Sequence, residues 1–400
     1  MNAASSIQPR LLGQMTERAV LRELQDSGPA SRADLARRMG NSPPTVSKAV
    51  ASLLDAGLLE EVNHEESGRG RPAKRVRLAS EKAQVLGLVI GARQCRLIAA
   101  GLDGKLREDT ELSFPTPDSY GALVAAIVEH AQALIDETDA TILGLGLSMP
   151  GLIDYRDKRC VLSPNLPVTD DHRPEADLAE GLGIACVMLQ ETHTLCLAEQ
   201  RYGEARGIAD FAMLDIETGV GLGVVSGGRV LTGHSGLAGE IGHIPLVPDG
   251  LRCGCGLNGC LETVASDAAI AAAISGSIGE TMSMDQILSM VIAGTYTPDG
   301  ELDAALEHLA VGMAMVINLF NPATLFVYGR LFELREGSFE RLLRETEARA
   351  LGPAFADCAI VRARGSKRQG AVAAIIEYLT DAVAPSIGAH SNFVKPGAKL

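Results

Sequence analysis

The sequence predicts two parts of different fold class: a small helical domain with a β-hairpin, and an α/β body of two lobes after it. In the first part, over residues 1–80, Gly and Pro separate three short helical runs. From residue 81 onward strand-like and helix-like runs alternate, which is typical of α/β layers. A second cluster of strand-like hairpins near residue 211 is similar in style to the first, so we expect two related lobes with a cleft between them.

The lobe boundaries follow from these runs. We place the first lobe at residues 81–200 and the second at residues 201–369. A C-terminal helix over 370–390 is expected to complete the first lobe.

The composition limits the class of protein. Of the 400 residues, 46% are hydrophobic and 22% are charged, enough to bury the cores of two or three domains. The N-terminal stretch has no continuous apolar run, and LAVGMAMVINLF at 309–320 is too short to span a bilayer. We therefore expect no membrane association and a cytoplasmic location. Eight cysteines are too sparse for a disulfide scaffold, which favours metal or thiol chemistry.

The charge is distributed unevenly along the chain. The net charge is −14, yet residues 1–80 hold more Lys and Arg than Asp and Glu. The rest of the chain therefore carries a large acidic excess, which repels polyanions. Any contact with nucleic acid should be confined to the first 80 residues.

The first two helical runs have recognisable ends. ERAVLRELQDSG (17–28) places Leu21 and Leu24 on an apolar stripe and is closed by Gly28-Pro29. SRADLARRMG (31–40) has Ser31 as its predicted N-cap and Gly40 as its stop.

The third run, NSPPTVSKAVASLLDAGLLEE (41–61), is predicted to be the recognition helix of a helix-turn-helix. Ser42 is the expected N-cap, and Pro43 stands at the first helical position, where a missing N–H costs nothing. One face is apolar: Val46, Val50, Leu53 and Leu54. The opposite face is small and polar, so it can enter a major groove.

A basic Gly- and Pro-containing tip between two strand-like runs follows this helix and predicts a wing. Arginines on such a tip suit the negative potential of a narrow minor groove. The alternative is a small helical bundle with a solvated basic linker. The candidate DNA-binding residues are Ser42, Thr45, Ser47, Lys48, Arg69 and Arg71.

The stretch GEIGHIPLVPDGLRCGCGLNGCLE (239–262) predicts a metal site. His243, Cys253, Cys255 and Cys260 supply one imidazole and three thiolates, which can close a tetrahedron around a structural Zn²⁺. Redox sensing and chance burial are the alternatives. The other cysteines are expected to be small core residues: Cys95, Cys160, Cys186, Cys196 and Cys358.

Several motifs together resemble the ROK family of repressors and sugar kinases. The most specific are GLAGEIGHIPL (236–246) and CGCGLNGCLETVAS (253–266). They are supported by SMPGLID (148–154), SPNLP (163–167), TGVGLG (218–223) and NPATLFVYG (321–329). The resemblance implies an actin-like ATPase fold for the body. A winged helix-turn-helix in front is similar to the regulator branch of that family, which includes repressors of xylose, glucose and N-acetylglucosamine genes.

The resemblance also implies a sugar site. In the family the matching positions contact a monosaccharide, and in this chain they are Asn165, Glu240, His243 and Glu262. Glu191 is expected to join them. A metal-locked loop would hold the carboxylates where they accept hydrogen bonds from sugar hydroxyls. The alternative is that these acids are ordinary surface charges.

Two departures from the family's kinases predict that the chain is not an enzyme. Val89 stands where the kinases have the Asp of a DxGxT hairpin, and Arg93 stands where they have its Thr. Glu191 replaces the Asp that acts as general base.

The sequence therefore predicts a sugar-responsive transcriptional repressor of carbohydrate genes that binds a DNA operator. A sugar in the cleft between the lobes would change operator affinity. The family implies a homodimer or a dimer of dimers. An ATP-dependent sugar kinase and a module regulated by a protein partner are the alternatives.

Overall fold

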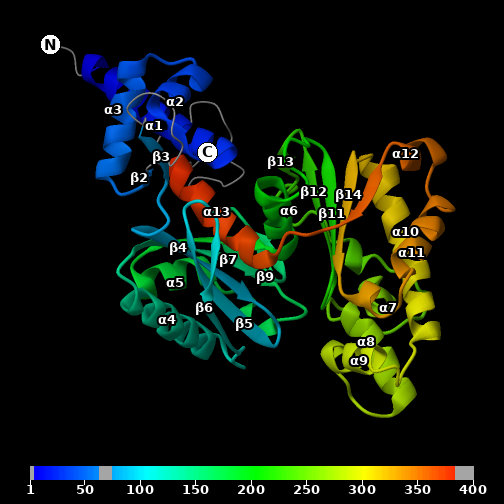
Figure 1. The fold of residues 1–400 in the computed structure, drawn as a ribbon. Helices are drawn as coiled ribbons and strands as arrows, with labels where there is room; N and C mark the ends of the chain where they lie inside the picture. Colours follow the sequence, from blue (N-terminus) through cyan, green and yellow to red (C-terminus); the bar gives the residue numbers. More distant parts are fainter. Residues whose placement is uncertain (1–3, 63–73, 383–400) are drawn as a thin grey trace. The chain divides into compact units, whose positions relative to one another are not determined.

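The computed structural model describes residues 4–62 and 74–382 (Figure 1). The chain divides into two compact units. The first unit consists of Met1–Met149, Arg173–Leu189 and Lys367–Leu400, and the second of Pro150–His172 and Gln190–Ser366. Residues 150–172 and 190–200 were expected in the first lobe, whereas they belong to the second unit by compactness.

The N-terminal part of the first unit is a winged helix-turn-helix, as predicted. Its strand β3 pairs antiparallel with both β1 and β2. Its elements are α1 (Ala4–Ser27), β1 (Ala30–Ser31), α2 (Arg32–Met39), α3 (Pro43–Asp55), β2 (Leu59–Val62) and β3 (Arg75–Leu78). Helix α1 begins well before the expected run at residue 17.

Local sequence signals set the ends of α2 and α3. The Ser31 hydroxyl accepts a hydrogen bond from the Asp34 N–H at 3.1 Å, and Gly40 ends α2 in the left-handed conformation. The Ser42 hydroxyl accepts from the Thr45 N–H at 3.4 Å, and Pro43 opens α3. The predicted apolar face of α3 is buried, except that Leu54 is only half-buried.

The Glu60 carboxylate connects the end of the winged domain to the start of the next sheet. Its Oε1 accepts hydrogen bonds from the backbone N–H groups of Ser80, Glu81 and Lys82 at 3.0–3.2 Å. Its Oε2 accepts from the Arg77 guanidinium at 3.1 Å. These bonds hold the pKa of Glu60 below its ordinary value, although partial burial opposes them.

The rest of the first unit is an α/β layer. Its sheet has the order β10-β7-β4-β5-β6. Helix α13 (Lys367–Ala382) packs on β4 and β7, and a Cβ at Gly146 would overlap the carbonyl oxygen of Ala371. The other elements are β4 (Ala83–Ile90), β5 (Gln94–Gly101), β6 (Leu106–Pro115), α4 (Tyr120–Glu137), β7 (Thr141–Met149), α5 (Pro174–Leu182) and β10 (Ala185–Gln190).

The second unit has a sheet of order β13-β12-β11-β14-β15 and a separate hairpin, β8 with β9. The strands are β8 (Leu152–Asp154), β9 (Arg159–Leu162), β11 (Phe211–Ile216), β12 (Val220–Ser226), β13 (Arg229–Val230), β14 (Thr324–Gly329) and β15 (Ala359–Arg362). The helices are α6 (Glu191–Tyr202), α7 (Glu262–Ala265), α8 (Asp267–Ile278), α9 (Met284–Ile292), α10 (Asp299–Phe320), α11 (Ser338–Glu347) and α12 (Gly352–Ala356).

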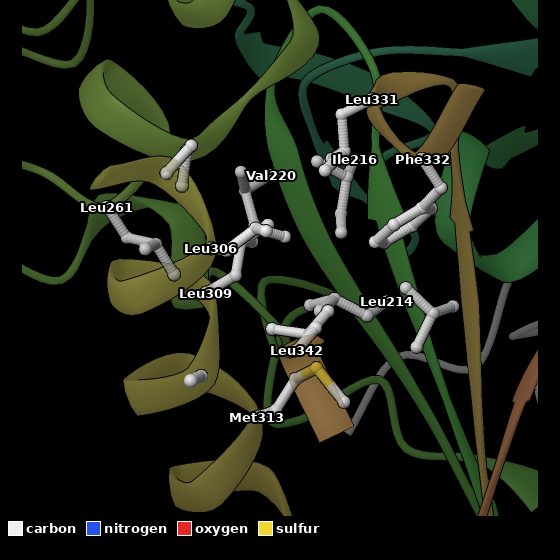
Figure 2. Close-up of a cluster of buried hydrophobic side chains, with 14 of the residues drawn as sticks. Leu214, Ile216, Val220, Leu261, Leu306, Leu309, Met313, Leu331, Phe332 and Leu342 are labelled. Carbon is white, nitrogen blue, oxygen red and sulfur yellow. The ribbon is translucent and has the colours of Figure 1, made fainter. Parts of the chain in front are cut away.

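The two faces of this second sheet bury different clusters. Along β11, Leu214 and Ile216 pack toward α10, whereas Phe211 and Met213 pack on the α6 side, as the period of two in a strand requires. Figure 1 shows α6 and α10 on opposite sides of the sheet. Figure 2 shows the α10 side, where Leu306, Leu309 and Met313 meet the strand residues.

Helix α10 is long and apolar enough by composition to cross a membrane, yet 56% of its apolar window is buried inside the protein. That burial is the pattern of a core helix. The five cysteines outside the 239–262 loop are buried and free, as expected of core residues.

Candidate functional site

The four predicted metal ligands converge. The ligand atoms of His243, Cys253, Cys255 and Cys260 all lie within 4.8 Å of one another. Cys255 Sγ is 3.7 Å from Cys260 Sγ, and Cys253 Sγ is 3.5 Å from His243 Nδ1. A tetrahedral zinc ion at ordinary bond lengths would place two thiolates about 3.8 Å apart, and a thiolate and an imidazole nitrogen about 3.6 Å apart. The donor set and its spacing therefore fit such an ion.

Backbone geometry folds the loop around this group. The Cys253 N–H donates to the Leu257 carbonyl at 2.8 Å, which closes the turn that carries Cys255. Gly259, with φ +69°, lies directly against Val247, and a Cβ there would overlap the Val247 carbonyl. Only glycine combines a positive φ with such a close approach to a neighbouring backbone.

Leu261 fixes the end of the loop to the core. It is 1% exposed and packs in the α10-side cluster of Figure 2. Its neighbours in sequence are the metal-ligand candidate Cys260 and the sugar-site candidate Glu262. Burial of this leucine therefore sets the position of both.

Two carboxylates flank the imidazole of His243. Glu240 Oε2 lies 3.8 Å from Nε2, and Glu262 Oε1 lies 3.6 Å from Nδ1. The side chains of Glu240 and Glu262 are 27% and 12% exposed. Such low exposure separates them from ordinary surface acids, which is the alternative raised by the sequence.

Burial raises the pKa of the Glu240 carboxyl above its ordinary value. A hydrogen bond from Gln190 Nε2 to Glu240 Oε1, at 3.0 Å, and the nearby His243 act in the opposite direction, and the Glu262 charge adds to the rise. The carboxylate is thus partly desolvated, where hydrogen bonds from a bound hydroxyl are strengthened.

Gly219, in the turn between β11 and β12, lies between two further predicted ligands. A Cβ at this position would collide with the Glu262 carboxylate and stand 3.0 Å from Asn165 Nδ2. Asn165 and Glu262 therefore approach the same glycine. Glu191, half-buried, is the first residue of α6 and directly follows Gln190.

All five predicted sugar-binding residues belong to the second unit. The described contacts join four of them, Asn165, Glu240, His243 and Glu262, directly or through Gly219. Glu191 is linked to this group through its neighbour Gln190, whose side chain bonds Glu240. Their roles as sugar ligands stay predictions.

Sequence reasoning missed Tyr155, which hydrogen-bonds the His193 ring and the Gln190 backbone. A lone tyrosine after a strand carries no pattern that could have revealed it.

The predicted DNA-binding face of α3 is open. Thr45, Ser47 and Lys48 are exposed, as is the cap Ser42, whose hydroxyl lies 2.8 Å from that of Thr45. Arg69 and Arg71 lie outside the described residues. In the same domain, Glu61 of β2 pairs with Arg32 of α2 and with Lys74, which directly precedes β3.

Two of the positions that depart from the kinase pattern, Val89 and Arg93, lie in the first unit's hairpin. Val89 is half-buried on β4 opposite Arg96, and Arg93 is exposed in the β4–β5 turn. Neither side chain supplies a carboxylate or a hydroxyl at this turn.

Comparison with known proteins agrees with both parts of the fold. A model of the MarR family matches residues 14–70. The DNA-binding transcriptional dual regulator NagC of Escherichia coli K12 is 28% identical over 336 residues, 81% of this chain and 82% of the relative.

Solved structures extend the comparison. A ROK family transcriptional regulator, described as a homologue of the E. coli MLC protein, has a TM-score of 0.77 at 24% identity and covers 93% of this chain and 97% of its own. A ROK hexokinase from Thermus thermophilus has a TM-score of 0.60 at 28% identity, over 74% of this chain and 99% of its own. A model of the ROK family matches residues 85–378, and the chain therefore belongs to the ROK family.

Proposed function

We propose that this protein is a cytoplasmic, sugar-responsive transcriptional repressor of carbohydrate metabolism genes. One observation carries the proposal: a capped helix with an open polar face precedes a ROK body that holds partly buried carboxylates beside a metal-type cluster. Neither a sugar kinase nor a simple DNA-binding module requires both this helix and this ROK body.

The DNA-binding role rests on α3. Its exposed hydroxyls and the Lys48 ammonium can reach base edges and phosphates, because no bulky side chain blocks their approach. Ser42, Thr45, Ser47 and Lys48 are the proposed contacts on the helix, and Arg69 and Arg71 those on the wing. The acidic remainder of the chain would disfavour binding elsewhere.

The sugar-binding role rests on the second unit. Asn165, Glu191, Glu240, His243 and Glu262 offer several acceptors and an imidazole to a compact polyol. His243, Cys253, Cys255 and Cys260 would hold a structural zinc ion, which supplies a fixed tetrahedral anchor for the loop. The protein's own part is then to present Glu240 and Glu262 in one orientation.

Regulation would follow from differential binding. A sugar that binds one conformation of the protein more tightly than the other shifts the balance between the two. The resulting change in operator affinity is typically about 5–150-fold. We propose a homodimer or a dimer of dimers, because paired heads match a palindromic operator.

A sugar kinase is the second candidate, favoured by Glu191 at the start of α6, since a carboxylate there could act as a base. Val89 and Arg93 count against it, because the first hairpin offers no carboxylate for metal and phosphate handling. We therefore propose that the chain is not an enzyme. A module controlled by a protein partner predicts no stabilisation by sugars.

One experiment separates these functions. Thermal shift with a monosaccharide panel is followed by selection of duplex DNA from the source genome and anisotropy titration with and without each stabilising sugar. We expect salt-dependent DNA binding that one sugar weakens, and no sugar-dependent ATP consumption.

The variant Lys48→Ala should weaken binding of the selected duplex and reduce the salt slope by about one. Lys82→Ala, which removes an equal charge outside the head, serves as the control. Rapid sugar phosphorylation without duplex binding would contradict the proposal.

A further inference from the structure

Tyr155 connects three segments that carry the proposed sugar ligands. It follows β8, its backbone N–H donates to the Ser235 carbonyl at 3.3 Å, and its ring lies against Gly236. Its hydroxyl accepts a hydrogen bond from the Gln190 N–H at 3.0 Å and lies 2.7 Å from His193 Nδ1. Tyr155 is thus fixed at once to the segment before Glu240 and to the start of α6.

The Tyr155–His193 pair is buried. Tyr155 is 9% exposed and His193 is 2% exposed, and their rings stack with centroids 5.7 Å apart. Burial lowers the pKa of His193 to about 4, so the ring is neutral at physiological pH. The phenol can donate to Nδ1 while it accepts from Gln190, and we assign the ring proton to Nε2 on this basis.

The start of α6, next to this pair, holds three of the five unsatisfied buried side-chain polar atoms in the described part of the chain. Within the described part of the chain, Gln190 Oε1, Thr192 Oγ1 and His193 Nε2 are buried without a hydrogen-bond partner. Such atoms are rare in folded proteins and are normally satisfied by a bound molecule or ordered water. They provide an acceptor, a hydroxyl and an N–H donor, a combination that suits the hydroxyls of a neutral polyol.

We propose that Tyr155 and His193 are positioning residues that hold the ligand-binding end of α6 and thereby determine which sugar the protein prefers. The proposal rests on the proposed function, because it concerns the same sugar site. Tyr155 fixes the backbone at Gln190, and the Gln190 side chain in turn holds Glu240. A shift at this junction therefore moves Gln190, Glu191 and Glu240 together.

A purely structural role makes a different prediction. If the pair only stabilised the fold, losing the hydroxyl would lower the melting temperature and leave the ratio of affinities for two sugar epimers unchanged. If it positions ligand groups, that ratio changes, because epimers differ only in where one hydroxyl points.

The test measures sugar affinity by calorimetry on the full-length, metal-containing protein. The probes are D-glucose, D-mannose, D-galactose, D-xylose, N-acetyl-D-glucosamine and N-acetyl-D-glucosamine 6-phosphate. Tyr155→Phe keeps the ring and removes the hydroxyl. We expect it to weaken the preferred sugar about 10-fold and to reduce its selectivity over an epimer or close analogue at least threefold, as expected when ligand groups are misplaced.

Tyr296→Phe is the matched control, because it removes a phenol hydroxyl that bonds Glu301 in the same unit, at 3.2 Å. It should leave every sugar affinity unchanged. Two His193 variants give a rescue test. His193→Asn keeps a group that can bond the Tyr155 hydroxyl and should retain the wild-type selectivity, whereas His193→Ala should lose it.

The outcomes are distinguishable. A wild type that binds none of the sugars overturns the proposed function and this proposal with it. A wild type that binds, together with Tyr155→Phe and His193→Ala variants of unchanged selectivity, overturns the positioning role alone. Equal loss of selectivity in His193→Asn and His193→Ala also overturns it, because the bond to Tyr155 would then not be the operative contact.

Discussion

The two five-stranded sheets share a strand order but differ in the chemistry at one hairpin. In each sheet a central strand, β4 or β11, pairs antiparallel with the next strand and parallel with a later one. One residue before the last pair of the hairpin, β4 has Val89 opposite Arg96, whereas β11 has Asp215 opposite Gly221. Asp215 is 5% exposed, so at this hairpin position the second sheet has a buried carboxylate where the first has an apolar side chain.

The turns beyond these positions differ as well. The β4–β5 turn exposes Arg93, and the β11–β12 turn brings Gly219 against Glu262 and Asn165. The strand order is thus common to both sheets, while the chemistry depends on a few residues at the hairpin tip. Three variants test whether ligand chemistry is confined to the second hairpin, and a fourth tests a buried carboxyl group of the same unit.

The largest effect should come from the candidate metal-ligand group beside the second hairpin. Cys260→Ser removes one of the four converging ligand atoms, so bound metal should fall from about one equivalent to near zero, with sugar binding lost. Metal analysis and calorimetry measure both. Cys358→Ser, a buried cysteine of the same unit, is the control and should keep its metal. Full metal content in Cys260→Ser would refute the site.

Gly219→Ala should have the next largest effect. The methyl group must displace the Glu262 carboxylate, and a ligand group moved by about 1 Å can cost up to about 100-fold in binding or rate. We expect sugar affinity to fall about 10-fold or more, measured by calorimetry.

The control for this variant is Gly276→Ala in α8, where a methyl group meets open space and should slightly stabilise the helix. Unchanged sugar affinity in Gly219→Ala would remove Glu262 from the proposed site.

A smaller effect concerns pH. Burial raises the pKa of Asp267 from 3.8 to about 7, with the nearby Glu217 adding to the rise, although backbone N–H groups of Arg330 and Leu331 and the Arg330 charge oppose it. Between these pH values the folded state holds a proton that the unfolded state releases, so stability falls as pH rises from about 4 to about 7.

The variant Asp267→Asn should reduce the fall in melting temperature that Asp267 causes as pH rises from about 4 to about 7. Asp210→Asn, at an exposed carboxylate of the same unit that accepts from the Gly227 N–H, should leave it unchanged. An identical pH dependence of the melting temperature in the wild type and in Asp267→Asn would contradict the raised pKa of Asp267.

The smallest effect is expected at the first hairpin. Val89→Asp restores a carboxylate opposite the exposed Arg96, so we expect a loss of stability of about 1 kcal/mol and no change in sugar affinity. Denaturant unfolding and calorimetry test both. A large change in sugar affinity would contradict the view that ligand chemistry is confined to the second hairpin.

The sequence predicted the parts of the fold that depend on local signals. Ser31, Gly40, Ser42 and Pro43 act within one helical turn, so their roles at the ends of α2 and α3 could be inferred without a structure. The assignment of residues 150–172 to the second unit could not, because it depends on which long-range contacts form.

The site divides in the same way. The spacing of His243, Cys253, Cys255 and Cys260 predicted a converging group, since glycines bring these near neighbours together. Tyr155 escaped notice because its partners, His193 and Gln190, are more than thirty residues away and no residue pattern links them. Long-range hydrogen bonds of single polar residues leave no periodic signal in a sequence.

The tripeptide Cys260–Leu261–Glu262 has a consequence for how this loop can evolve. Three adjacent residues face a candidate metal-ligand group, a hydrophobic core and a candidate sugar site, so deleting or inserting one residue would move all three side chains away from their partners at once. Side-chain replacement can alter these functions one at a time, whereas changes of length cannot. A deep insertion and deletion scan should therefore find this tripeptide intolerant even where conservative replacements survive.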